Sequence, residues 1–283
     1  MSVGAIVGYD GSPTASAAID AGGLLFPRAH AWITYLWTPP FASERLRHRL
    51  RVLAHDVNEL IEMIEREGQC EAEQLVAMGV TLARAAGWDA EPLLKHTWGA
   101  EGLRLAQCAE QQAADVVLVG SRGLGGTQAV LGSVSDMVVH YTKRPALVIP
   151  HPLLAAEHAA LADGPVLVGW DGSAGATTAF TEAERLFPDR DVLLVSADED
   201  NAAPLPPSEA GGRNVLMLQV DKGHGFHARA TSQALVACAN ERSAAVLVVG
   251  SRGRTAAREI LLGSVAMATL HHAHRPVMVV PSP

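Results

Sequence analysis

The most constraining feature of this 283-residue chain is that it contains the same series of short motifs twice. VGYDGS at 7–12 returns as VGWDGS at 168–173, and GSRG at 120–123 returns unchanged at 250–253. A Gly-Ser-Val triplet and an Arg-Pro pair before an apolar run then follow in the same order in both copies. Four ordered matches predict an internal duplication, so we expect two related folding units.

The two copies differ in length. The offset between equivalent positions falls from 161 residues at the first motif to 130 at the second, so the second copy lacks about 31 residues in this interval. In the first copy the interval contains a long helical pattern over 41–86, which we expect Gly68 to divide into two helices. In the second copy residues 197–212 carry three prolines and a glycine pair, which predict that no helix forms. The loss should leave sheet surface for another domain or chain to bury.

The apolar positions of this helical pattern alternate between spacings of four and three residues: Leu46, Leu50, Leu53, Val57, Leu60 and Ile64. An amphipathic helix lying on its own sheet explains this spacing, and so does a coiled-coil seam for a partner helix. The first interpretation is favoured.

Each copy alternates short apolar runs, bounded by Gly, Asp or Pro, with Ala-rich helical segments. Such runs are typical of strands buried on both faces, and strand–helix alternation predicts a parallel sheet with right-handed crossovers. We therefore expect an α/β protein with two tandem Rossmann-like domains. Each has a mainly parallel five-stranded sheet flanked by helices, at 1–150 and, in shortened form, at 165–283. Residues 151–164, which contain Pro152 and end at Gly164, form the predicted linker.

Composition excludes several classes of protein. A formal net charge of −8 disfavours nucleic acid as a partner, because phosphate neutralisation needs a basic face. No apolar run approaches the roughly 18 residues of a membrane span, and the first ten residues lack a secretory signal, so we expect a cytoplasmic protein without a membrane partner. Cys70, Cys108 and Cys238 lie far apart in Ala-rich segments and are predicted to be buried, reduced thiols.

A glycine cluster at 120–126 directly follows a predicted strand and leads toward a helix that starts near Gly132. Glycines let a backbone approach a phosphate closely, and the free amides of a helix N-terminus donate to its oxygens. Arg122 adds a positive charge, and Ser133 and Ser135 are expected to cap the helix and to bind oxygen atoms. This position, at the carboxyl end of a parallel strand, is the usual ligand edge of such sheets.

Asp10, where the first strand ends, has two interpretations that the residues leave open. Its carboxylate suits a base amino group or a ribose hydroxyl, and it equally suits a turn or a helix N-cap. Neither GxxxxGK[ST] nor GxGxxG after the first strand is present, which disfavours a P-loop enzyme and a dinucleotide dehydrogenase. No general acid or nucleophile stands at a recognisable spacing, so no catalytic residue is predicted. His271, His272 and His274 are interpreted as a helix end, and no metal site is predicted.

Through these motifs the chain resembles a tandem universal stress protein over nearly its whole length. The resemblance implies an adenine nucleotide alpha hydrolase-like fold that binds ATP, with or without Mg²⁺, through GxxG, nine residues and G[ST]. In the first domain it implies a nucleotide site made of Gly8, Tyr9, Asp10, Leu36, Gly120, Arg122, Gly123, Gly132, Ser133, Val134 and Ser135. In the second domain it implies Gly169, Trp170, Asp171, Ala197, Gly250, Arg252, Gly253, Gly263, Ser264 and Val265.

Both copies depart from this pattern. The first has eight residues instead of nine between Gly123 and Gly132, and the second has Ala266 where the first has Ser135. We therefore expect adenine nucleotide in at least one domain, without choosing between them. The resulting hypothesis is a stress-response regulator that acts through nucleotide-linked conformation or association, with its domains paired in one chain and a homodimer possible. The alternatives are a structural or dimerisation module that binds no nucleotide, and a slow ATPase.

Overall fold

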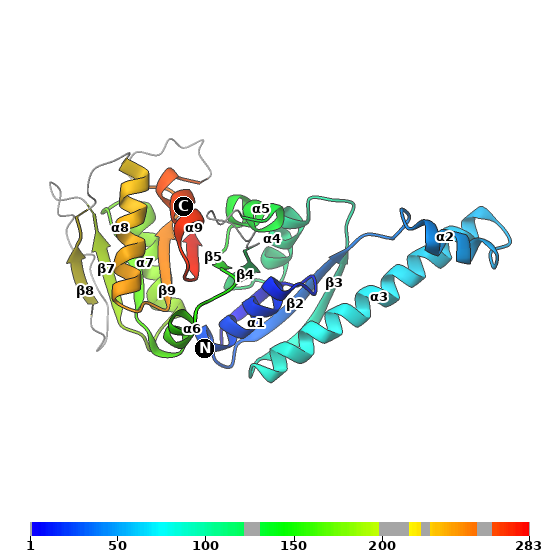
Figure 1. Cartoon of the computed structure of the whole chain (residues 1–283), viewed down its shortest axis with the longest axis horizontal. Helices are drawn as coiled ribbons and strands as arrows, with labels where there is room; N and C mark the ends of the chain where they lie inside the picture. Colours follow the sequence, from blue (N-terminus) through cyan, green and yellow to red (C-terminus); the bar gives the residue numbers. More distant parts are fainter. Residues whose placement is uncertain (1, 122–130, 198–214, 222–226, 254–261, 283) are drawn as a thin grey trace.

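The computed structural model of the chain describes residues 2–121, 131–197, 215–221, 227–253 and 262–282. The described strands form one ten-stranded sheet in the order β3-β2-β1-β4-β5-β10-β9-β6-β7-β8 (Figure 1). The strands of the first repeat are β1 (Gly4–Gly8), β2 (His30–Trp37), β3 (Asp89–His96), β4 (Val116–Gly120) and β5 (Ala146–Ile149). Those of the second are β6 (Val166–Gly169), β7 (Val192–Ser196), β8 (Val215–Gln219), β9 (Val246–Gly250) and β10 (Val277–Val280).

Helices cover both faces of this sheet. One face packs against α1 (Pro13–Leu25), α3 (Val57–Ala85), α6 (Ala155–Asp163) and α7 (Ala174–Leu186), and the other against α4 (Glu101–Gln111), α5 (Ser133–Tyr141), α8 (His227–Glu241) and α9 (Ser264–His272). Ile6 and Val7, adjacent residues of β1, are both fully buried on opposite faces, which is why the strands read as continuous apolar runs. The predicted α/β fold class is confirmed.

The segment after β2 differs from the expected division at Gly68. A short helix, α2 (Glu44–Arg51), is followed by α3, which continues without interruption through Gly68. The chain breaks earlier, where the Asp56 carboxylate accepts a hydrogen bond from the Glu59 amide at 2.9 Å and caps α3. A Cβ at Gly68 would lie 2.5 Å from Pro40 Cδ, so this glycine permits close packing against the end of β2 rather than ending a helix.

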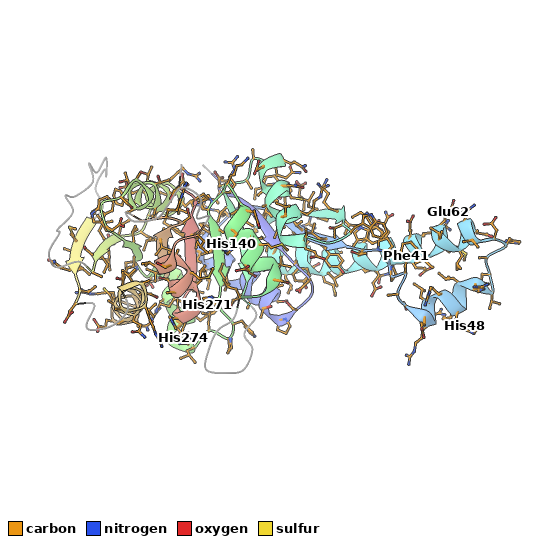
Figure 2. All side chains as sticks on the ribbon, turned by 90° about the horizontal axis from the view of Figure 1, so that it is seen from above. Phe41, His48, Glu62, His140, His271 and His274 are labelled. Atoms are coloured by element: carbon orange, nitrogen blue, oxygen red, sulfur yellow. The ribbon has the colours of Figure 1, made fainter. Side chains whose placement is uncertain are left out.

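The C-terminal part of α3 lies on its own sheet, where Val76, Val80 and Ala83 join the buried core. The first turns of α3 and the whole of α2 form a hairpin that projects beyond the sheet (Figures 1 and 2). Figure 2 shows Phe41, His48 and Glu62 on this projection, well separated from His140, His271 and His274 on the body. The favoured amphipathic interpretation therefore describes the C-terminal part of α3 only. Residues 198–214, where the second repeat was expected to lack this cover, lie outside the described residues.

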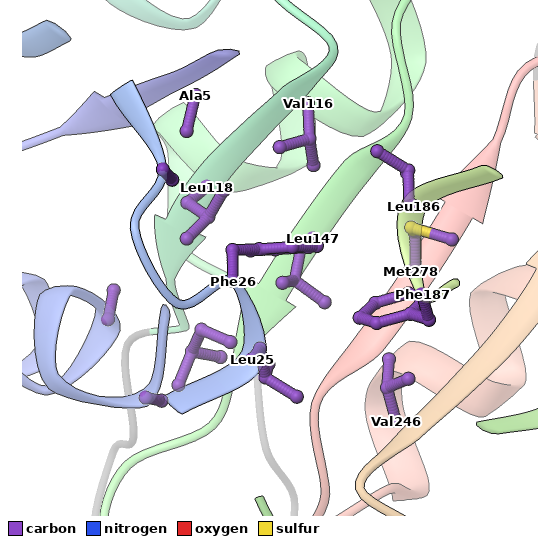
Figure 3. Close-up of a cluster of buried hydrophobic side chains, with 14 of the residues drawn as sticks. Ala5, Leu25, Phe26, Val116, Leu118, Leu147, Leu186, Phe187, Val246 and Met278 are labelled. Carbon is purple, nitrogen blue, oxygen red and sulfur yellow. The ribbon is translucent and has the colours of Figure 1, made fainter. Parts of the chain in front are cut away.

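The two repeats meet where β10 pairs with β5 in antiparallel register, with Met278 opposite Leu147. Next to this junction Phe26, which follows α1, stacks on Phe187, which follows α7, with ring centroids 5.1 Å apart (Figure 3). Both rings are almost fully buried in a cluster that contains strand residues of both repeats. The junction is therefore part of one continuous hydrophobic core.

The predicted linker contains a packed helix. In α6, Leu161 is fully buried, and His158 Nε2 lies 2.8 Å from a carboxylate oxygen of Asp20 on α1. The Arg190 guanidinium, from the loop before β7, donates to the carbonyls of Leu161 at 2.6 Å and Gly164 at 2.8 Å. These contacts fix the linker against both repeats.

The cysteine prediction is correct for two of the three residues. Cys108 and Cys238 are free and buried at equivalent positions of α4 and α8, whereas Cys70 is free but exposed on α3. Helical spacing places Cys70 on the solvent face, between the buried positions Gly68 and Ala72.

Candidate functional site

Each repeat has a cavity at the carboxyl ends of its strands. The cavity of the first repeat has a volume of about 130 Å³. Its lining brings together these predicted residues: Gly8, Tyr9, Asp10, Leu36, Gly120, Gly132, Ser133, Val134 and Ser135. Arg122 and Gly123 lie outside the described residues. Sequence reasoning missed other lining residues, among them Tyr35 and Glu101.

The cavity of the second repeat is larger, at about 480 Å³. Its lining contains all of the residues predicted for it: Gly169, Trp170, Asp171, Ala197, Gly250, Arg252, Gly253, Gly263, Ser264 and Val265. Thr231 and Leu235 of α8 also line it, and sequence reasoning missed both. Ligand cavities for small organic molecules usually have volumes of about 300–1,000 Å³, a range that includes this cavity.

The aspartates at the ends of β1 and β6 each organise a turn. Asp10 Oδ1 accepts a hydrogen bond from the Ser12 amide, and Asp171 Oδ1 accepts one from the Ser173 amide, both at 3.0 Å. Ser12 and Ser173 then cap α1 and α7 through their side-chain oxygens. Asp10 therefore has the structural role of organising the turn, while the N-cap of α1 is Ser12; a contact between Asp10 and a base or ribose stays a prediction. Both aspartates also line their cavities.

The glycines that end β4 and β9 have a packing role. A Cβ on Gly120 would lie 2.5 Å from the carbonyl oxygen of Thr14 in α1. A Cβ on Gly250 would lie 2.7 Å from the carbonyl carbon of Gly175 in α7. Such distances are too short for any side chain, so these positions require glycine because a strand end touches the first turn of a helix. Close approach to a phosphate is not needed to explain them.

Ser135 is engaged within the fold and does not cap α5. Its hydroxyl donates to the carbonyl of Gly120 at 2.8 Å, and the residue is almost fully buried. The N-cap of α5 is Gly132, and Ser133 is the first helical residue. Ala266, which replaces Ser135 in the second repeat, is equally buried. The second repeat therefore lacks the internal hydrogen bond that Ser135 makes in the first, whereas a contact between Ser135 and a ligand stays a prediction.

The helices that begin at the two cavities have no side-chain cap. Their N-caps are Gly132 and Gly263, and neither makes a side-chain hydrogen bond to the first turn. In α9 the first intrahelical bond runs from the Met267 amide to the Gly263 carbonyl, so the amides of 264–266 precede the helical ladder. Uncapped amides and the helix dipole together favour an anion at this end.

Two residues that line the second cavity each have a buried polar atom without a hydrogen-bond partner. The atoms are Trp170 Nε1 and Thr231 Oγ1, and among the described side chains the only other such atom is Ser232 Oγ. Leaving a buried polar atom unpaired costs about 1–3 kcal/mol, and native proteins seldom accept that cost without a function. Trp170 is 5% exposed and packs edge-on against Phe180, so its indole is held in place at the cavity wall.

The charges differ between the two cavities. Arg252 lines the second, where its Nη2 donates to the Ser282 carbonyl at 3.0 Å. Glu101 and Asp10 both line the first. Burial and the nearby carboxylates of Glu71 and Asp10 raise the pKa of Tyr35 at the first cavity, since they disfavour its negative form. Among the described residues, no group of three or more His, Cys, Asp or Glu side chains is arranged to hold a metal ion.

Comparisons with known proteins agree with this architecture. The profile of the "Universal stress protein family" matches residues 5–150 and 164–281. A universal stress protein of Mycolicibacterium smegmatis is 34% identical over 187 residues, which are 60% of this chain and 62% of that protein, so the match spans less than two thirds of this relative. A universal stress protein of Mycobacterium tuberculosis is 30% identical over 234 residues, which are 74% of this chain and 76% of that protein.

A solved universal stress protein from Archaeoglobus fulgidus superposes on the whole fold. The TM-score is 0.68 at 18% identity, with 99% of this chain and 98% of that one covered. In the part of the chain that the structure describes, no helix is long and apolar enough to cross a membrane.

Proposed function

The chain belongs to the universal stress protein family, and from that premise we propose that its second domain binds an adenine nucleotide with the phosphates at the N-terminus of α9. One observation carries this proposal. A single cavity of about 480 Å³ combines uncapped helix amides, the Arg252 side chain and two unpartnered buried polar atoms. The amides and the guanidinium suit the phosphates, and the unpartnered atoms suit a polar organic group.

The base and ribose would lie at the ends of β6 and β7. Trp170, Asp171 and Ala197 line this part of the cavity. The indole Nε1 is a donor only, so it fits an acceptor nitrogen or oxygen of the ligand. Asp171 is an acceptor and fits an amino or hydroxyl group. This division of donors and acceptors matches an adenine nucleoside.

We propose that binding regulates rather than initiates chemistry. The helix that would hold the phosphates, α9, is followed by β10, the strand that pairs with β5 of the first repeat. A small shift of α9 on nucleotide binding would act directly on the junction between the repeats. We therefore propose a cytoplasmic stress-response regulator in which ATP alters the pairing of the domains, or of two chains.

Calorimetric titration of the purified chain with ATP and with adenosine, each with and without Mg²⁺, tests the proposal. We expect saturable ATP binding in the micromolar range. Arg252→Met should weaken ATP binding about tenfold, about 1.4 kcal/mol, and should leave adenosine binding nearly unchanged. Arg242→Met, at an exposed arginine just after α8, is the matched control and should behave as wild type.

Two results would overturn the proposal. One is the lack of saturable binding below millimolar ATP, together with no nucleotide in the purified protein. The other is an equal loss of ATP affinity in the Arg252 and Arg242 variants, which would indicate general charge attraction. The alternative of an interaction module without a nucleotide would then be the better account.

A further inference from the structure

The two cavities differ at one position that neither nucleotide motif contains. Glu101 lines the first cavity and Thr231 lines the second, and the two are separated by the 130-residue offset of the repeat. The same offset relates Leu105 to Leu235, which also line the two cavities, and Cys108 to Cys238. Glu101 and Thr231 are therefore equivalent residues in the early part of α4 and α8.

The other charged positions of the two sites are matched. Asp10 in the first cavity corresponds to Asp171 in the second. Arg252 lines the second cavity, and its equivalent in the sequence of the first repeat, Arg122, lies outside the described residues. The exchange of Ser135 for Ala266 changes no charge. Among the residues known to line the cavities, Glu101 is thus a negative charge that the second cavity lacks.

Glu101 lines the first cavity together with Gly132 and Ser133 at the start of α5. A Cβ on Gly102, the neighbour of Glu101, would lie 2.5 Å from Met137 Cβ and 2.6 Å from the Val134 carbonyl oxygen, so the start of α4 touches α5. In the second domain α8 packs against α9 in the same way. A carboxylate in the wall of this cavity repels a polyphosphate.

Thr231, the equivalent residue of the second repeat, has an uncharged hydroxyl group in place of the carboxylate. Thr231 lines the second cavity, and its hydroxyl oxygen is buried and has no hydrogen-bond partner in the described part of the protein. A hydroxyl both donates and accepts, so it suits a phosphate or ribose oxygen and carries no charge to oppose it.

We propose that the residue at position 101 or 231 decides which domain accepts a polyphosphate nucleotide: Thr231 admits it to the second domain, and Glu101 excludes it from the first. This inference rests on the proposed function of the second domain. It assigns the two domains different roles, with one nucleotide per chain. The first cavity, with Asp10 and Glu101 in its wall, then favours neutral or cationic small molecules over anions.

Charge exchange at these two positions tests the inference. Thr231→Glu should lower ATP affinity at least tenfold. Glutamine has nearly the size of glutamate without its charge, so Thr231→Gln should lower ATP affinity much less. Glu101→Gln should raise ATP affinity of the first domain at least tenfold, so that calorimetry detects a second site. Thermal unfolding of each variant confirms that it folds. Because adenosine lacks phosphates, its affinity should change little with any of the three substitutions.

The outcomes separate this inference from the proposed function. A wild-type chain that binds two ATP molecules with similar affinity contradicts the inference and leaves nucleotide binding intact. Equal effects of Thr231→Glu and Thr231→Gln also contradict it, because size rather than charge would then decide. A wild-type chain that binds no ATP contradicts the proposed function and the inference together.

Discussion

The aromatic pair at the junction of the repeats allows a quantitative test of how strongly the two domains are coupled. Phe26 and Phe187 stack with ring centroids 5.1 Å apart and an interplanar angle of 25°, and each is 2% exposed. Replacing either ring by leucine keeps most of the apolar volume, so each single variant should lose about 1–1.5 kcal/mol of unfolding free energy. An aromatic pair contributes about 0.5–1.5 kcal/mol beyond its buried area. The double variant should therefore lose less than the sum of the single variants by that amount.

Urea unfolding followed by tryptophan fluorescence measures these free energies. Wild type should unfold in one transition, because the buried cluster around the pair includes strands of both repeats. Phe180, which is equally buried but packs on Trp170 within the second repeat, provides the control. Phe26→Leu combined with Phe180→Leu should be additive. A coupling below about 0.3 kcal/mol for Phe26 with Phe187, the usual limit of additivity for distant sites, would refute the reasoning that this stack joins the domains.

Two further predictions concern residues outside the cavities. Arg190→Met should lower the free energy of unfolding by about 3 kcal/mol, because two short hydrogen bonds to the Leu161 and Gly164 carbonyls are lost. Arg66→Met, at an exposed arginine, is the control. A decrease below about 1 kcal/mol for Arg190→Met would contradict the role of Arg190. Burial raises the pKa of the Cys108 and Cys238 thiols, so iodoacetamide should alkylate the exposed Cys70 first, and equal rates for all three would contradict this. Because the folded state favours the protonated thiols, their contribution to stability should fall as the pH rises above the ordinary thiol pKa.

The duplicated motifs and apolar runs were enough to predict the fold class, because strands buried on both faces leave a strong sequence signal. The helical segment after β2 was harder. Gly68 is a helix breaker by propensity, at a cost of about 1 kcal/mol, yet α3 continues through it because the contact with Pro40 and Trp37 needs a residue without a side chain. The real break follows α2, where Asp56 supplies a cap. Tertiary packing overrode local propensity at this position.

The site residues were predicted from motifs at strand ends, so residues on helices were missed. Glu101 and Thr231 carry no motif and lie in ordinary helical sequence. The signal that would have found them is the offset of the repeat, which places an acid and a hydroxyl at one equivalent position. Ser135 shows the reverse error, since a serine near a helix N-terminus suggests a cap or a ligand contact, and only the structure shows its bond to the Gly120 carbonyl.

The motifs that both repeats share therefore reflect packing requirements of the fold, and they do not by themselves indicate a ligand in this chain. Gly120 and Gly250 recur because each strand end touches the first turn of a helix, and that contact is required whether or not a ligand binds. A cavity that lost its ligand would still keep these glycines. Positions where the repeats diverge, while both copies line a cavity, are under no such packing constraint. Glu101 and Thr231 form such a pair, and for this reason the proposal that the two domains differ in nucleotide binding is based on the difference between the copies rather than on their shared motifs.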